Sequence, residues 1–297
     1  QPSGDAPHRR WGPSGPVAIW MYWQTTRYKL SLTRPLVMGI VNATPDSFSD
    51  GGQHGTSAQA MAWCDRLVRE GADILDIGGE STRPGGHAPD RDEELRRVLP
   101  VVRHAVTLGR PVSVDTSRPE VMAEAIAAGA DIINDVRALR RPGALAVLAD
   151  APDTGVCLMH MRGEPDTMQQ HTTYGDVVHE VALALGQRMR EVVDAGVQIE
   201  RISLDPGIGF AKTAEQNWQL MRRQGELCAI GRPLLVGWSR KSALGVLTGR
   251  PVHDRLGASV AAALAAVCRG AHIVRVHDVA ATVDALKVAA AAGLIGG

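Results

Sequence analysis

Several polar residues of this chain follow short apolar runs, and their types limit the chemistry that they could perform. One group is Asp115, Asn134, Asp205 and Lys241. Carboxylates and an amide accept and donate hydrogen bonds along the edge of a ring, and an ammonium donates to a carbonyl or a ring nitrogen. These types suit the nitrogens and carbonyl of a heteroaromatic amide. The group therefore predicts a pocket that binds such a ring.

A second group combines one neutral amide, one hydroxyl and cationic donors. Its members are Asn42, Thr82, Arg83, Arg275 and His277. Cationic donors bind phosphate oxygens, and Mg²⁺ prefers oxygen ligands such as the amide oxygen of Asn42. We therefore expect an anion site, with Mg²⁺ as the cofactor and Asn42 as its protein ligand.

The apolar runs that precede these residues must position them. They are rich in Val, Ile and Leu and cover residues 36–42, 74–79, 111–116, 132–136, 156–161, 202–206, 234–239 and 273–278. Each is nearly continuous in its apolar character, which is typical of parallel strands buried on both faces. Helical patterns lie between most of them, at residues 57–70, 92–107, 119–128, 174–195, 214–223 and 256–269, and an Ala-rich terminal helix is expected over 283–297.

This alternation of strands and helices predicts an α/β fold, a single-domain (β/α)₈ TIM barrel over residues 21–297. A doubly wound open sheet is the alternative. We interpret residues 1–20, which are rich in Pro, Gly and Arg, as a disordered leader or cloning remnant outside the fold.

In a barrel, the carboxyl ends of the strands meet at one rim, where catalytic groups lie. Any single polar residue there could instead cap a helix or form a turn. Polar residues end all eight predicted strands, which argues against capping as their common role. Two polar, Gly-flanked loops, residues 43–52 and 78–86, follow the first two strands and could close over the rim, although ordinary surface loops have similar compositions.

Composition restricts the possible partners and the compartment. The chain has 32 Lys plus Arg and 32 Asp plus Glu, so no net charge attracts nucleic acid or an anionic membrane. No apolar run approaches the roughly 18 residues of a membrane span. The four cysteines lack C-x-x-C spacing, and we interpret them as reduced core residues rather than metal or redox ligands. We expect a cytoplasmic protein without nucleic-acid or membrane partners.

The motifs around these residues resemble a known family. The segments "MGIVNATPDSFSDGG" (38–52) and "DIGGESTRPGG" (76–86) are similar to two signature loops of the dihydropteroate synthases, a family of pterin-binding TIM barrels. The segments "VDTSRPEV", "IINDVRAL", "CLMHMRGEPDTMQ", "LDPGIGFAK", "LLVGWSRKS" and "GAHIVRVHDV" resemble its later strand ends in the same order. The similarity extends over about residues 34–288.

The resemblance implies an activity and a role for each matching position. The implied reaction joins 6-hydroxymethyl-7,8-dihydropterin diphosphate to p-aminobenzoate in folate biosynthesis, with sulfonamides as mimics of the second substrate. The matching pterin-binding positions are Asp115, Asn134, Asp205 and Lys241, with Met159 and Gly237 in the same pocket. Asn42 matches the position that engages Mg²⁺ and diphosphate, and the anion and neighbouring contacts match Thr82, Arg83, Arg275 and His277. The p-aminobenzoate positions match Phe48, Pro84, Lys241 and Ser242.

The resemblance also implies a homodimer formed through the later helices and a dissociative reaction. In that reaction, positive charge develops on the pterin methylene and negative charge on the departing diphosphate. We expect Asp115, Asp205, Lys241, Arg275 and His277 to be the catalytic residues. The sequence departs from some family members at Ile208, where Phe also occurs, and at Ala211, where Gly is also seen. Neither change removes a reactive group.

Two related functions are the alternatives. A methyltetrahydrofolate:corrinoid methyltransferase shares the Asp and Asn strand ends, but it lacks this combination of loops. A non-catalytic pterin-binding protein would not need the anion-site residues Asn42, Arg275 and His277. A purely structural barrel would leave the whole series of motifs unexplained.

Overall fold

The computed structural model describes residues 22–45, 53–81 and 88–297 of the chain. The expected leader therefore lies outside the described residues. The same is true of four predicted site residues, Phe48, Thr82, Arg83 and Pro84. Parts of the two loops over residues 43–52 and 78–86 are also outside them.

Eight parallel strands form the barrel. They are β3 (Leu36–Asn42), β4 (Ile74–Gly78), β5 (Val112–Asp115), β6 (Ile132–Asp135), β7 (Gly155–Met159), β8 (Ile202–Asp205), β9 (Leu235–Val236) and β10 (Ile273–Val276), paired in the order β8-β7-β6-β5-β4-β3-β10-β9. Leu204 on β8 forms an isolated parallel β-bridge with Leu234, the residue before β9. The N–H of Leu204 donates to the Pro233 carbonyl at 2.9 Å. The two ends of the sheet therefore meet, and the predicted (β/α)₈ barrel is confirmed.

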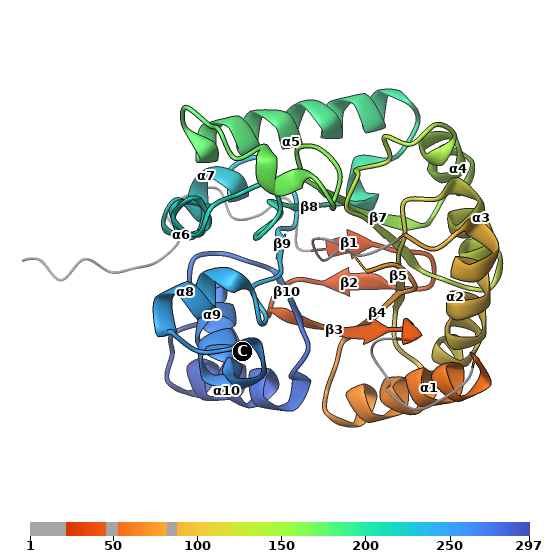
Figure 1. Ribbon diagram of the computed structural model, residues 1–297, viewed down its shortest axis with the longest axis horizontal. Helices are drawn as coiled ribbons and strands as arrows, with labels where there is room; N and C mark the ends of the chain where they lie inside the picture. Colours follow the sequence, from red (N-terminus) through yellow and green to blue (C-terminus); the bar gives the residue numbers. More distant parts are fainter. Residues whose placement is uncertain (1–21, 46–52, 82–87) are drawn as a thin grey trace, which may run out of the picture.

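Helices surround the strands (Figure 1). They are α1 (Gln53–Arg69), α2 (Arg91–Ala105), α3 (Pro119–Ala127), α4 (Ala144–Asp150), α5 (Val177–Asp194), α6 (Ala214–Arg222), α7 (Gln224–Cys228), α8 (Ser242–Thr248), α9 (Leu256–Cys268) and α10 (Val279–Ala291). Within the described part of the chain, no helix has both the length and the apolar character that crossing a membrane requires.

Several predicted boundaries were wrong for local reasons. The strand expected over residues 234–239 ends at Val236, because the chain turns there: Lys241 N–H donates to the Trp238 carbonyl at 3.1 Å, and Arg240 has a φ of 61°. The helix expected from residue 174 begins at Val177, because the Asp176 side chain accepts from the first-turn amides of the helix. The terminal helix runs over Val279–Ala291 rather than 283–297.

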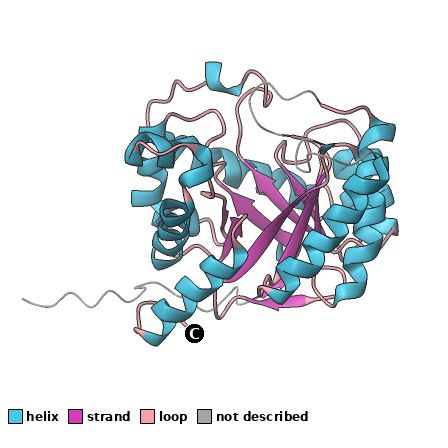
Figure 2. Cartoon of the chain, turned by 60° about the horizontal axis from the view of Figure 1, so that its bottom comes forward, coloured by secondary structure: helices cyan, strands magenta, loops and turns pink. Residues whose placement is uncertain are grey.

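A hairpin that the sequence did not predict closes the amino-terminal end of the barrel. It consists of the antiparallel strands β1 (Tyr22–Gln24) and β2 (Lys29–Ser31), visible below the barrel in Figure 2. Trp23 is completely buried, and its Nε1 donates to the Arg201 carbonyl at 2.8 Å. Its ring packs into one apolar cluster with Leu36, Met38, Ile74, Ile132, Cys157, Leu235 and Ile273. This cluster forms the floor of the barrel interior.

Candidate active site

The floor cluster determines which side chains reach the opposite mouth of the barrel. Successive residues of a strand point to opposite faces, so the residue two positions after a floor residue also points inward. Along five strands, these next inward positions are Asp76, Asn134, Met159, Gly237 and Arg275. The alternation therefore gathers chemically useful side chains directly above an apolar floor.

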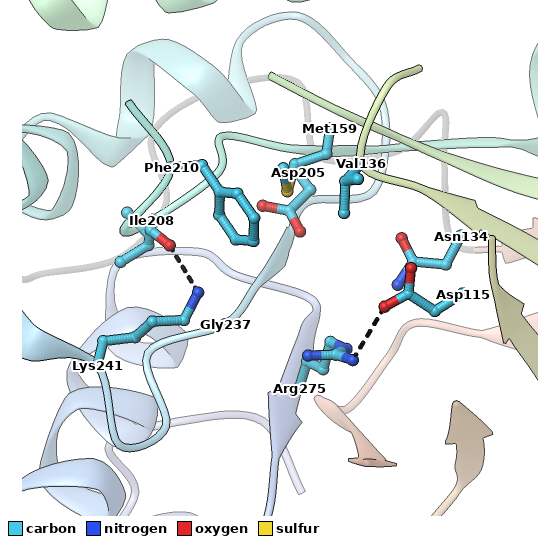
Figure 3. Close-up of a pocket in the computed structure, with 10 residues that line it drawn as sticks. All are labelled: Asp115, Asn134, Val136, Met159, Asp205, Ile208, Phe210, Gly237, Lys241 and Arg275. Atoms are coloured by element: carbon cyan, nitrogen blue, oxygen red, sulfur yellow. Dashed lines mark hydrogen bonds and ion pairs between the residues drawn. The ribbon is translucent and has the colours of Figure 1, made fainter. Parts of the chain in front are cut away.

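Four of these inward positions, all but Asp76, line one pocket at the mouth (Figure 3). Its lining residues are Asp115, Asn134, Val136, Met159, Asp205, Ile208, Phe210, Gly237, Lys241 and Arg275. Asp115 pairs in register with Asn134, and Met159 pairs with Asp205. The space measures about 360 Å³ including its open mouth. All six residues predicted for the ring site thus line the same pocket, and we call it the mouth pocket.

Asp76 lies beneath the mouth pocket and was missed by the sequence analysis. Its carboxylate is fully buried. Oδ1 accepts from Ser113 Oγ at 2.8 Å, while Oδ2 accepts from Asn134 Nδ2 at 3.1 Å and from Arg275 Nε at 2.7 Å. Two signals were present in the sequence: a carboxylate in the middle of the apolar strand "ILDIG", and its place as the first residue of the quoted motif "DIGGESTRPGG". Asp76 therefore orients two of the residues that line the pocket.

The pocket carboxylates have raised pKa values. Burial raises the pKa of Asp115 well above its usual value and the nearby Asp76 raises it further, whereas Arg275, whose Nη2 is 3.3 Å from Asp115 Oδ2, opposes the shift. Burial also raises the pKa of Asp205, whereas the hydrogen bond that it accepts from Gly207 N–H at 2.8 Å lowers this pKa and so opposes the shift. Negative charge in this pocket is therefore poorly solvated and suited to bind N–H donors or developing positive charge.

Lys241 occupies the other side of the pocket. Its Nζ donates to the Ile208 carbonyl at 2.8 Å and lies 4.5 Å from the centroid of the Phe210 ring. Burial lowers the pKa of Lys241 to about 8, and Asp205 opposes this shift. Ile208, Phe210 and Val136 provide apolar surface for a flat ring. Phe210 and Val136 were not predicted, although both lie within the quoted motifs "LDPGIGFAK" and "IINDVRAL".

The remaining predicted residues lie around the pocket without lining it. Asn42 ends β3, where its half-buried side chain forms no hydrogen bond with the residues that the structure describes. His277 Nδ1 is 2.8 Å from Ser239 Oγ. Ser242 is exposed at the first position of α8.

Two polar strand ends, Asp135 and His160, lie outside the pocket, and Asp135 forms the turn that was the alternative role. Asp135 points away from the barrel interior, and its carboxylate accepts from the N–H groups of Arg137 at 2.9 Å and Leu139 at 2.8 Å. His160 is buried beside Lys212. Neither lines the mouth pocket.

The comparisons with known proteins agree with this geometry. A profile of the family described as "Pterin binding enzyme" matches residues 38–277. The dihydropteroate synthase of Neisseria meningitidis serogroup B is 54% identical over 278 residues, which are 92% of this chain and 98% of that protein. This chain belongs to the dihydropteroate synthase family.

Solved structures of the dihydropteroate synthase family share the fold. The Xanthomonas albilineans enzyme with 4-aminobenzoic acid matches with a TM-score of 0.85 and 53% identity, covering 89% of this chain and 95% of that one. The Burkholderia cenocepacia enzyme complexed with 7,8-dihydropteroate matches with a TM-score of 0.84 and 49% identity, covering 92% and 96%. The resemblance found in the sequence is confirmed, and neither the open sheet nor the methyltransferase is supported.

Proposed function

We propose that this protein is a transferase that condenses 6-hydroxymethyl-7,8-dihydropterin diphosphate with p-aminobenzoate, yielding 7,8-dihydropteroate and diphosphate for folate biosynthesis. The observation that carries the proposal is the convergence of Asp115, Asn134, Asp205 and Lys241 on one pocket in a member of this family. The complexes of the Xanthomonas and Burkholderia relatives with 4-aminobenzoic acid and 7,8-dihydropteroate support the choice of substrates.

Hydrogen bonding in the pocket fits the edge of a pterin. Asn134 Nδ2 donates to Asp76, so its Oδ1 is left to accept from a ring N–H. One oxygen of Asp205 accepts from Gly207, which leaves the second oxygen for the ligand. The Lys241 ammonium can donate to the ring carbonyl or a ring nitrogen.

The difficult step is cleavage of the bond between the pterin methylene and the diphosphate oxygen. The arylamine of p-aminobenzoate is neutral at pH 7 and needs no base for its attack, and its proton is lost after the new C–N bond forms. Asp115 and Asp205 stabilise positive charge that spreads into the ring. Arg275 uses Nε and Nη2 for Asp76 and Asp115, which leaves Nη1 for the departing diphosphate. His277 follows Arg275 at the same mouth and is the second cationic candidate.

Magnesium fits this site only together with a ligand. The described residues contain no group of three or more His, Cys, Asp or Glu side chains that could hold a metal ion. Asn42 supplies one neutral amide oxygen, and the diphosphate would supply further oxygens. Bound Mg²⁺ would neutralise charge on the departing diphosphate. We expect calorimetry to detect tight Mg²⁺ binding only when diphosphate or the pterin diphosphate is present; tight binding to the ligand-free protein would contradict this.

We further propose a homodimer formed through the later helices. Val246 and Leu247 on α8 are 74% and 66% exposed. Val252, in the short 3-10 helix before α9, and Leu256, the first residue of α9, are 50% and 52% exposed. Exposed apolar residues at this density are typical of protein interfaces. Light scattering should give twice the chain mass, and Leu247→Lys should shift it to one chain mass; a monomeric wild-type protein would contradict the proposal.

A cytoplasmic location without nucleic-acid or membrane partners is also proposed, on the basis of the balanced charge. Fractionation of the source cells tests this proposal. Recovery of the protein in a membrane or nucleic-acid fraction would contradict it.

Diphosphate release tests the catalytic proposal. The assay uses the pterin diphosphate with and without p-aminobenzoate and Mg²⁺, and follows 7,8-dihydropteroate by chromatography. We expect stoichiometric release and product only when all three are present. Tight binding of the pterin diphosphate without any turnover would instead identify a non-catalytic pterin-binding protein.

A further inference from the structure

The wall of the mouth pocket beside Lys241 is a loop, residues 207–211, that no regular secondary structure supports. Ile208 and Phe210 of this loop line the pocket. Gly207, Gly209 and Ala211 adopt left-handed φ angles of 72°, 82° and 53°. The buried Ala211 has a side chain where the conformation favours glycine. The loop therefore needs other contacts to keep its shape.

Side chains provide these contacts by donating to every carbonyl of the loop. The five bonds are Lys212 Nζ to Gly207 O (3.0 Å), Lys241 Nζ to Ile208 O (2.8 Å), Gln169 Nε2 to Gly209 O (3.1 Å), Lys212 Nζ to Phe210 O (2.8 Å) and Tyr174 Oη to Ala211 O (3.0 Å). The Gly207 bond is buried and those of Ile208, Phe210 and Ala211 are partly buried, so these donors replace water and determine the path of the backbone. Lys212 alone supplies two of the five bonds.

Lys212 connects this loop to the neighbouring strand end. Its side chain is 3% exposed and lines no part of the mouth pocket. Nζ lies 3.1 Å from His160 Nδ1 and 3.4 Å from the His160 carbonyl, directly after β7. Burial lowers the pKa of His160 to about 2, so the ring is neutral and Nδ1 accepts the bond. Burial lowers the pKa of Lys212 to about 7, and no carboxylate of the described residues lies in hydrogen-bond contact with its amine. Burying this polar group is costly, and a Met would fill the same space. A requirement for its donors explains why a lysine occupies the position.

We propose that Lys212 is a positioning residue for the pterin site. It holds the 207–211 loop so that Ile208 and Phe210 face the ring, and it fixes the Ile208 carbonyl that orients the Lys241 ammonium. The inference rests on the proposed function, because it concerns the binding of the pterin diphosphate. It separates Lys212 from residues that touch the substrate. It also predicts a much larger effect on the binding of the pterin, which faces Ile208, Phe210 and Lys241, than on p-aminobenzoate, whose predicted site shares only Lys241 with this wall.

The test compares Lys212→Met with Lys287→Met, a matched change at an exposed lysine on α10. Calorimetry measures the Kd of 6-hydroxymethyl-7,8-dihydropterin diphosphate, and steady-state kinetics measures the KM of p-aminobenzoate at saturating pterin diphosphate. For Lys212→Met we expect the pterin Kd to rise about tenfold or more, because the loop carbonyls of Gly207 and Phe210 both lose their side-chain donor. The KM of p-aminobenzoate should change less than about twofold. Lys287→Met should leave both values unchanged.

Near-UV circular dichroism checks that Lys212→Met is folded. If it is folded and its pterin Kd equals that of the wild type, or if both substrates are weakened alike, the proposal is overturned. If it does not fold, Tyr174→Phe decides: this variant removes one donor, to the Ala211 carbonyl, and an unchanged pterin Kd would overturn the proposal. If the wild-type protein does not bind the pterin diphosphate, the proposed function itself is refuted. If the wild type binds it and the variants bind it equally well, only the role of Lys212 is refuted.

Discussion

Arg275 on β10 and Asp76 on β4 meet inside the barrel, with Nε 2.7 Å from Oδ2, although they are 199 residues apart in the chain. The same carboxylate oxygen accepts from Asn134 Nδ2 at 3.1 Å. One buried group therefore sets both the direction of a cation at the mouth pocket and the orientation of an amide that faces the ligand.

We expect Asp76→Asn to lower kcat/KM by about a hundredfold, because two charge-assisted hydrogen bonds of about 1.5–3 kcal/mol each are weakened and partly replaced by donor–donor contacts. Asn134 could then rotate and present its NH₂ group to the ring. Steady-state kinetics and pterin calorimetry measure the effect, and Asp284→Asn on the exposed face of α10 is the control. A folded Asp76→Asn enzyme with kcat/KM close to wild type would show that the hydrogen bonds of Asp76 to Arg275 and Asn134 have no functional role.

Asp115→Asn should separate activity from stability. The pKa of Asp115 is raised in the folded protein, so the folded state keeps the proton to higher pH than the unfolded state does. Stability of the ligand-free wild type therefore falls as pH rises above 3.8, through the window up to the raised pKa. Asp115→Asn has no carboxyl group to titrate at this position, so its stability does not fall over this pH window. At pH 7 its Tm should equal or exceed that of the wild type, the difference should disappear below pH 4, and activity should be lost.

Asp176→Asn provides a control of opposite sign for that experiment. The hydrogen bonds from Arg223 and the backbone lower the pKa of Asp176, so its contribution to stability is present at neutral pH and is lost in acid. Scanning calorimetry from pH 3 to pH 8 measures both variants. A Tm of Asp115→Asn well below the wild type at pH 7 would contradict the assignment of Asp115 as a destabilising, functional carboxylate.

Asp205→Asn should lose pterin affinity far more than it loses stability. The asparagine can still accept from Gly207 N–H, so the loop after β8 keeps its anchor. The second oxygen, which we assign to the pterin N–H groups, becomes an NH₂ donor and opposes them. Calorimetry with the pterin diphosphate and a thermal melt of the same sample make the comparison. Wild-type affinity in the folded variant would refute the assignment.

p-Aminobenzoate and its sulfonamide mimics should bind well only after the pterin diphosphate is bound or ionised. Its predicted site combines Lys241 and Ser242 with Phe48 and Pro84, which lie outside the described residues. Ordering a loop costs about 1–2 kcal/mol per residue, more than so small an acid recovers from its own contacts. Equilibrium binding of labelled p-aminobenzoate with and without pterin and diphosphate decides the question, and equal affinities would refute the order.

The barrel and most of the mouth pocket could be predicted because both depend on local patterns. Continuous apolar runs identified the strands, and polar residues at their ends identified Asp115, Asn134 and Asp205. Local patterns could not identify Asp76, because its partners come from three other strands and depend on register across the closed barrel. Nor did they separate Asn134, which points inward, from its neighbour Asp135.

Short elements escaped prediction for a different reason. Helices α4, α7 and α8 contain seven, five and seven residues, too few to show a helical period. The hairpin of β1 and β2 has three residues in each strand. Lys212 ends the quoted motif "LDPGIGFAK" but follows no apolar run, so the apolar pattern did not indicate that it is buried beside the pocket.

Trp23 closes one end of the barrel. Among the residues that the structure describes, this side chain and the apolar layer above it fill the amino-terminal end, so a molecule in the mouth pocket leaves through the mouth and not through the floor. A compound seated above the pterin would therefore hold it in place and slow its escape. The residence time of one substrate then depends on the occupancy of the other, and an inhibitor directed at the outer position would trap the inner ligand rather than displace it.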